Sequence, residues 1–300
     1  MTAATPDFAT LEATLEGLRQ RVDAALRRLT EDAARSPRIG AAIEDSLFAP
    51  AKRLRPILTL LVAEVLRADP EAVLPAAGAV EMIHTASLIL DDLPVMDDAR
   101  LRRGRPTCHV AHGEATAILA AFALMNRAFG LLGEGWPGAP DGALRAQISR
   151  DLARAVGLDG MIAGQESDLA MTGRALDFAT LEFIHSRKTG SLFTASADLG
   201  ALASRAPAAE RAAVVAYAKN LGLAFQIVDD VIDAAGVPSE AGKDVGQDRA
   251  KTTFVTFAGL EGARQLAREL VETSERALVP FGPRAQPLRD LAWYVLHRKK

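Results

Sequence analysis

Four carboxylates crowd into residues 91–98, whose sequence is DDLPVMDD, and form the strongest chemical signal in the chain. They follow an apolar stretch at 80–90 with helical spacing, and Pro94 should end or kink that helix. Asp97 would then lie just past the kink and could turn back toward Asp91. Such crowding is unfavourable unless cations neutralise it, and carboxylate oxygens are the ligands that Mg²⁺ prefers. The alternative, a solvated helix end, is less favoured because acidic residues there oppose the helix dipole.

A second acidic motif, QIVDDVID, occupies residues 226–233. On a helix, Asp229 and Asp233 lie about 40° apart on one face, one turn from each other. Gln226 and Asp230 join this polar stripe, while the neighbouring residues are apolar. A polar stripe on a buried helix must face partners, ions or a cavity. Two such stripes on different helices predict a cavity with metal ions between facing carboxylates.

Basic clusters lie close to both acidic motifs and offer phosphate-binding groups. They comprise Lys52, Arg53, Arg55, Arg102, Arg103, Arg105, Lys188, Lys243 and Lys251. A single such cluster is usually a solvated surface, but clusters after both acidic motifs predict a site for metal-bridged polyphosphates. His84 lies seven residues before Asp91, within about 20° of the same helix face, and so points along the acidic stripe.

Composition excludes several classes of protein. The chain has 300 residues, is 49% hydrophobic and carries 35 basic against 38 acidic residues, which predicts a globular protein and argues against a nucleic-acid binder. Its one cysteine, Cys108, excludes an intrachain disulfide and fits a reducing compartment. We find no run of the ~18 apolar residues that a membrane span needs, and no apolar signal segment. We therefore expect a cytoplasmic protein without a membrane span.

Helical periodicity recurs along most of the chain, and strand-like alternation is scarce. Together with abundant Ala, Leu, Arg and Glu, this predicts an all-α fold of roughly ten helices. The stretch 115–132 is apolar nearly all round, which suggests a buried layer. No stretch is typical of an interdomain linker, so we expect a single domain over residues 1–300.

In their order, these motifs resemble those of the trans-polyprenyl diphosphate synthases, from about residue 52 to the C-terminus. The resemblance implies the isoprenoid synthase fold, a bundle of mostly antiparallel helices around a central cavity, in a homodimer. It also implies head-to-tail condensation of isopentenyl diphosphate with an allylic diphosphate. Mg²⁺ would be the cofactor, as three ions when substrate is bound.

The resemblance implies a role for each matching residue. As metal ligands it implies Asp91, Asp92, Asp97, Asp229, Asp230 and Asp233. The first five of these aspartates, together with Lys188, are also implied to be catalytic. For isopentenyl diphosphate it implies Lys52, Arg55, His84 and Arg103. For the allylic diphosphate it implies Arg102, Lys188, Thr189, Gln226, Lys243 and Lys251. Gln165 and Asp168 match a Gln-x-x-Asp motif near the metals. Two positions depart from the family pattern, Ala51 for a common Gly and Gln247 for a common Lys.

Chain length is predicted from Ala86 and Ser87, about one turn before Asp91. In family members that stop at fifteen carbons, this level often carries an aromatic ring. Both residues are small here, so we expect the twenty-carbon geranylgeranyl diphosphate. The alternative is the fifteen-carbon farnesyl diphosphate, because residues 294–300 resemble the ending of bacterial farnesyl synthases.

Two other activities are less favoured. A terpene cyclase would share the fold and the first motif, but would normally carry an Asn/Ser/Glu metal motif in place of the second. A non-catalytic regulatory subunit of a prenyltransferase heteromer would be expected to have lost aspartates, and all are present here.

Overall fold

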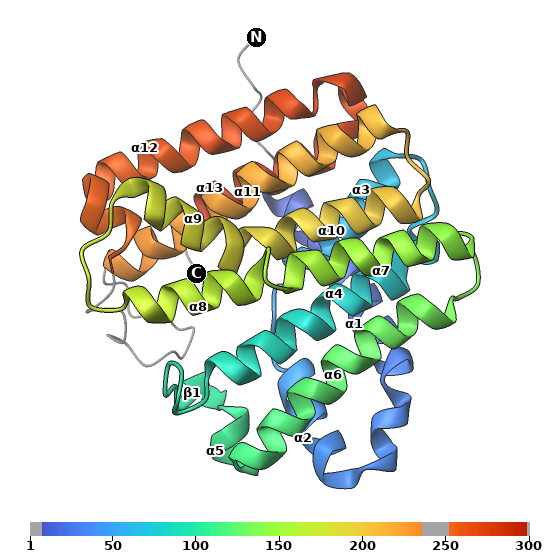
Figure 1. The fold of residues 1–300 in the computed structure, drawn as a ribbon. Coiled ribbons are helices and arrows are strands. Elements are labelled where there is room, and N and C mark those ends of the chain that lie inside the picture. Colours follow the sequence, from blue (N-terminus) through green and yellow to red (C-terminus); the bar gives the residue numbers. More distant parts are fainter. Residues whose placement is uncertain (1–7, 236–251, 299–300) are drawn as a thin grey trace.

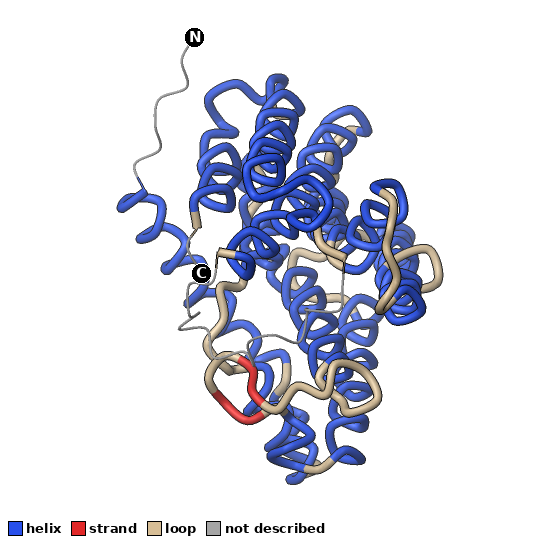
Figure 2. The backbone as a smooth tube through the Cα atoms, turned by 90° about the vertical axis from the view of Figure 1, so that its left-hand side faces the viewer, coloured by secondary structure: helices blue, strands red, loops and turns tan. Residues whose placement is uncertain are grey.

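The computed structural model describes residues 8–235 and 252–298, and it confirms the all-α fold (Figure 1). The helices are α1 (Phe8–Leu29), η1 (Glu31–Arg35), α2 (Pro37–Leu47), α3 (Leu54–Val65), α4 (Pro70–Asp91), α5 (Cys108–His112), α6 (Glu114–Glu134), α7 (Gly142–Val156), α8 (Met161–Met171), α9 (Phe178–Lys188), α10 (Gly190–Ala203), α11 (Ala208–Ala234), α12 (Phe254–Ala277), η3 (Val279–Ala285) and α13 (Gln286–His297). Within these described ranges the only sheet is a hairpin of β1 (Leu101–Arg102) and β2 (Arg105–Pro106), drawn red in Figure 2.

The core is built around α3, α4 and α10, whose side chains are buried on most faces. α4 contacts α3, α6 and α10, α10 packs against α11, and α11 packs against α12 (Figure 1). Short loops join the successive pairs α3–α4 and α10–α11, so these neighbours run in opposite directions. The first acidic motif therefore follows the end of a core helix.

The helix α6 corrects one expectation from the sequence. We predicted that its apolar stretch lies in a buried layer, but Leu119 and Phe122 are 52% and 60% exposed. The buried layer is formed by α4 and its neighbours instead. Apolar composition on all faces does not reveal which face meets the core. α6 packs against α2, α4, α5 and α7 and leaves the face of Leu119 and Phe122 exposed.

By length and mean hydropathy α4 and α6 could each cross a membrane, although neither contains an uninterrupted run of ~18 apolar residues. In α4, 72% of the apolar window is buried inside the protein, which accounts for its composition as a core helix. In α6 the buried share is 39%.

Candidate active site

The first acidic motif is folded back on the end of α4, as Pro94 predicts. α4 ends at Asp91, and the backbone N–H of Asp97 donates to the Asp91 carbonyl at 3.0 Å. The Ala99 N–H donates in the same way to the Asp92 carbonyl at 3.2 Å. The turn thus brings the backbone of Asp97 back to the end of a core helix, and the expected return of Asp97 toward Asp91 is confirmed.

Asp91 is held by groups from α8 and α9. The Gln165 amide donates to Asp91 Oδ1 at 2.6 Å, and Lys188 Nζ lies 3.6 Å from the same oxygen. Lys188 also pairs with Asp168 at 2.8 Å. Gly164 allows this approach, because a Cβ there would lie 2.2 Å from the Lys188 backbone nitrogen. The structure therefore brings the Gln-x-x-Asp motif, Lys188 and Asp91 together, as the resemblance implies.

Asp92 points to another side of α4, toward the hairpin. It is 3% exposed, and Arg102 Nε donates to both of its carboxylate oxygens at 2.8 Å. Burial raises the pKa of Asp92, and the Arg102 guanidinium opposes that shift. Asp92 and Arg102, which we predicted to bind a metal ion and a diphosphate, are thus bound to each other in this structure.

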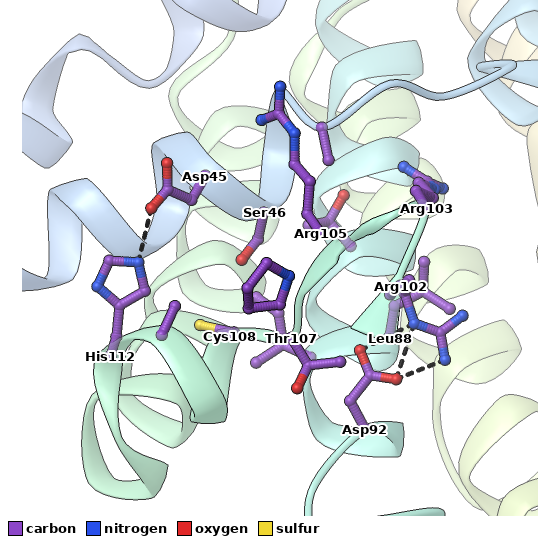
Figure 3. Close-up of a pocket in the computed structure, with 15 residues that line it drawn as sticks. Asp45, Ser46, Leu88, Asp92, Arg102, Arg103, Arg105, Thr107, Cys108 and His112 are labelled. Atoms are coloured by element: carbon purple, nitrogen blue, oxygen red, sulfur yellow. Dashed lines mark hydrogen bonds and ion pairs between the residues drawn. The ribbon is translucent and has the colours of Figure 1, made fainter. Parts of the chain in front are cut away.

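The sequence did not predict the hairpin or the cavity beneath it. A cavity of about 230 Å³ lies between the hairpin, α2, α4 and α5, with Arg102 and Asp92 at one edge (Figure 3). The turn at Arg103 and Gly104 has φ of 55° and 74°, which matches a two-residue hairpin. Glycine at the second turn position was the only sequence signal for it. This cavity lies on the hairpin side of α4, so the predicted cavity between the two acidic motifs stays a prediction.

The second acidic motif divides its side chains between different partners. Asp229 pairs with Arg298, which follows α13, at 2.7 Å. Asp230 is 8% exposed and accepts from the Phe254 N–H at 2.9 Å, at the start of α12. Asp233 is exposed. Sequence reasoning missed Arg298 and the contact of Asp230 with the backbone of α12, and the metal-binding role of Asp230 stays a prediction.

A chain of contacts links the two motifs across the break between α9 and α10. α9 ends at Lys188 and α10 begins at Gly190, as expected from the Lys-Thr-Gly sequence. Between them, the Thr189 hydroxyl donates to Gln226 Oε1 at 2.9 Å, one turn before Asp229 on α11. Because Lys188 lies beside Asp91, the break brings the two acidic motifs to one region of the molecule.

Arg55 and His84 meet on the inner side of this region. Arg55 Nη1 lies 3.2 Å from His84 Nε2, and its guanidinium lies over the Phe193 ring at 4.7 Å from the centroid. Burial lowers the pKa of Arg55 to about 10 and takes the pKa of His84 well below its usual value. The imidazole is therefore neutral and accepts a hydrogen bond from Arg55. Arg55 Nε has no hydrogen-bond partner, as expected of a group placed to receive an anion.

The remaining predicted residues have fewer contacts with the two acidic motifs in this structure. Lys52 is exposed, and Arg103 lies in the hairpin turn, where burial lowers its pKa. Lys243, Lys251 and Gln247 lie outside the described residues. Within the described part of the chain, no three Asp, Glu, His or Cys side chains are close enough to hold a metal ion by themselves.

Residues 36–278 match the family model for polyprenyl synthetases. The chain belongs to this family. It is 40% identical over 270 residues to a farnesyl diphosphate synthase of Geobacillus stearothermophilus, covering 89% of this chain and 91% of that protein. It is 39% identical over 289 residues to a geranylgeranyl diphosphate synthase of Pseudescherichia vulneris, covering 94% of this chain and 92% of that protein. Synthases of both product lengths are thus found among its relatives.

Solved structures of polyprenyl synthetases have the same fold. An FPP/GFPP synthase from Zymomonas mobilis has a TM-score of 0.84 and 36% identity, over 96% of this chain and 99% of that chain. A geranyltransferase from Legionella pneumophila has a TM-score of 0.87 and 31% identity, over 98% of this chain and 99% of that chain. The isoprenoid synthase fold that the resemblance implies is therefore confirmed.

Proposed function

We propose that the protein is a head-to-tail prenyltransferase that condenses isopentenyl diphosphate with allylic diphosphates and releases diphosphate. The proposal is based on the way the two acidic motifs come together. Lys188 contacts Asp91 of the first motif, and the next residue, Thr189, contacts Gln226 of the second. The pair of Arg55 and His84 lies in the same region. Carboxylates for cations and arginines for phosphate then lie within one site. The family and the names of its relatives support the same reaction.

The donor set of the two motifs fits Mg²⁺. Carboxylate oxygens are hard ligands, and cationic groups already lie against them, Lys188 at Asp91 and Arg298 at Asp229. We propose Asp91, Asp97 and Asp229 as the principal ligands, with Asp92, Asp230 and Asp233 supporting. When bound, Mg²⁺ would stabilise the charge of the departing diphosphate. The absence of three clustered ligands in the described residues fits sites that substrate phosphates complete.

The side chains would act by position and charge. Arg55 would bind the diphosphate of isopentenyl diphosphate, with Lys52 and Arg103, while neutral His84 orients its guanidinium. Lys188, Thr189 and Gln226 would hold the allylic diphosphate as its carbon–oxygen bond breaks. The alkene of isopentenyl diphosphate would attack the allylic carbon and form the new carbon–carbon bond. The cation left on the isopentenyl unit would then lose a proton from the adjacent carbon to the released diphosphate, which restores a double bond. We propose the twenty-carbon product, with the fifteen-carbon product as the alternative.

The test is incubation of the purified protein with Mg²⁺, isopentenyl diphosphate and dimethylallyl diphosphate, followed by chromatography of the products. We expect linear prenyl diphosphates and release of diphosphate. A cyclised hydrocarbon would indicate a terpene cyclase instead. No reaction in the presence of both substrates would contradict the proposed function.

The substitution Arg55→Ala should separate the two substrates. We expect the KM for isopentenyl diphosphate to rise at least ~10-fold, because a charged hydrogen-bond donor to phosphate is lost. The KM for the allylic substrate should change much less. Steady-state kinetics with each substrate varied in turn checks this prediction, and an effect confined to the allylic substrate would show that the two sites are exchanged.

We also propose that the protein acts as a cytoplasmic homodimer, with a second copy covering the exposed face of α6. Leu119 and Phe122 lie three residues apart on that face, and they are large apolar side chains. Light scattering should give the mass of two chains for the wild type and a lower mass for Phe122→Asp. Val279→Asp, at an exposed position on η3, is the matched control and should remain dimeric. A monomeric wild type would contradict the proposal.

A further inference from the structure

Arg53 has an unusual backbone conformation between two proposed substrate-binding residues, Lys52 and Arg55. Its φ and ψ are 52° and 32°, in the left-handed region, directly before the first residue of α3. A residue with a Cβ is strained there, and such strain persists only where the surroundings fix it. Arg53 is also 3% exposed, so its side chain points into the protein. It is therefore not placed to bind a diphosphate from solvent.

Three elements fix the Arg53 guanidinium. Its Nε donates to Asp23 Oδ1 of α1 at 2.8 Å, and its Nη1 donates to Glu81 Oε1 of α4 at 2.6 Å. Its Nη2 donates to the carbonyl of Leu47, the last residue of α2. Because the fork of an arginine is planar and rigid, donors on all three nitrogens fix its position and orientation. This anchoring accounts for the strained backbone of Arg53.

Glu81 connects Arg53 to the substrate site through α4. It is 2% exposed and lies three residues before His84, about one turn along the same helix. His84 in turn lies 3.2 Å from Arg55. Consecutive turns of one helix therefore hold Arg53 and Arg55, and the same helix ends at Asp91.

Glu81 also supplies negative charge to the basic residues around it. It is the only glutamate in the described part of the chain that is buried. Its charge opposes the effect of burial on the pKa of Arg55 and on the pKa of Arg103. One buried carboxylate thus pairs directly with Arg53 and favours the charged form of both other arginines.

We propose that Arg53 and Glu81 are positioning residues that set Lys52 and Arg55 in place for the diphosphate of isopentenyl diphosphate. The proposal rests on the proposed function. The buried pair holds the backbone of Arg53 in its left-handed conformation just before α3. Lys52 and Arg55, which flank Arg53 and Leu54, are then both presented to one ligand. Lys188 and Gln226, which we propose to hold the allylic diphosphate, lie on α9 and α11 and have no contact with Arg53, so the pair should affect isopentenyl diphosphate much more than the allylic substrate.

The first test is steady-state kinetics of Glu81→Gln, which keeps the shape of the side chain and removes its charge. We expect the KM for isopentenyl diphosphate to rise at least ~10-fold, about 1.4 kcal/mol. The KM for the allylic substrate and kcat should stay within about threefold. Breaking a buried pair from one side also destabilises the fold, so thermal melting accompanies the kinetics.

A double substitution separates positioning from stability. Arg53→Met with Glu81→Met replaces both partners by apolar side chains, which buried sites tolerate better than one unpaired charge. We expect a melting temperature closer to wild type than that of Glu81→Gln, with the same rise in KM for isopentenyl diphosphate. The matched control is Asp198→Asn, which weakens the ion pair of Asp198 with Arg211 between α10 and α11. It should lower stability without a selective change in either KM.

Calorimetric titration of isopentenyl diphosphate into wild type and Glu81→Gln tests the proposal without turnover. Weaker binding by the variant supports it. Equal Kd values for wild type and Glu81→Gln would overturn it. A rise in the KM for isopentenyl diphosphate that Asp198→Asn shows as well, at a similar loss of melting temperature, would also overturn it. A wild type that binds isopentenyl diphosphate more tightly than the variant but forms no product would contradict only the proposed function.

Discussion

Replacing Asp91 or Asp229 with Ala should lower turnover by at least ~10²-fold, the scale of losing one strong electrostatic stabiliser. Each substitution removes a proposed oxygen ligand from one of the two acidic motifs, and each also takes a carboxylate away from a neighbouring cation, although Lys188 keeps its pair with Asp168. Lys188 loses the carboxylate at 3.6 Å, and Arg298 loses the one at 2.7 Å. Product formation from isopentenyl diphosphate and an allylic diphosphate, measured at saturating Mg²⁺, checks this prediction.

The dependence on Mg²⁺ distinguishes a ligand from a residue that only shapes the site. We expect both alanine variants to need more Mg²⁺ for half-maximal rate than the wild type. Asp91→Asn should keep the contacts to Gln165 and Lys188 but bind the cation less well, so its Mg²⁺ requirement should also rise. Asp32→Ala, at an exposed carboxylate on η1, is the control and should behave as wild type. Near-wild-type condensation by both alanine variants would contradict the metal-binding role of the two motifs.

Sequence reasoning was most accurate where the signal is local. The end of α4 and the return of Asp97 toward Asp91 follow from Pro94 and from helix geometry, which act over a few residues. The break at Thr189 follows from the interrupted apolar pattern around it. The order of the motifs along the chain, through the family resemblance, then predicted the fold.

Contacts between distant segments could not be predicted in this way. Arg298 reaches Asp229 from the other end of the chain, and Arg53 reaches Glu81 across 28 residues. Neither pair has a local pattern, because tertiary packing alone brings the residues together. For a related reason, the contact with α12 could not be predicted for Asp230. Its carboxylate lies about 100° around the helix from Asp229, and only the packing of α12 shows where that direction leads.

The chain-length residues show the same limit. Ala86 and Ser87 were predicted to line the path of the growing chain below Asp91. Ala86 is completely buried in the hydrophobic core, whereas Ser87 is half-buried on the face that carries His84 and Asp91. The Ser87 hydroxyl donates to the His84 carbonyl at 2.8 Å. Small residues at this level were read correctly from the sequence, but their directions differ by about 100°.

A ring at position 87 should therefore shorten the product. We expect Ser87→Phe to shift the main product from twenty carbons toward fifteen, because the ring would project one turn before Asp91 without entering the packed core. Ala86→Tyr should give the same shift with a lower melting temperature, since an added ring in a filled core costs about 1–3 kcal/mol. Chromatography of the products from dimethylallyl and isopentenyl diphosphates measures both effects.

Ser87→Thr is the matched control, because it adds one methyl group and keeps the hydroxyl. It should leave the product distribution close to that of the wild type. If the ring acts by blocking the path, Ser87→Phe should also keep the rates of the first two condensations, which build fifteen carbons from dimethylallyl diphosphate, while losing the third. A wild type that already stops at fifteen carbons would contradict the twenty-carbon prediction. Unchanged products from both ring variants would show that the growing chain does not pass this face of α4.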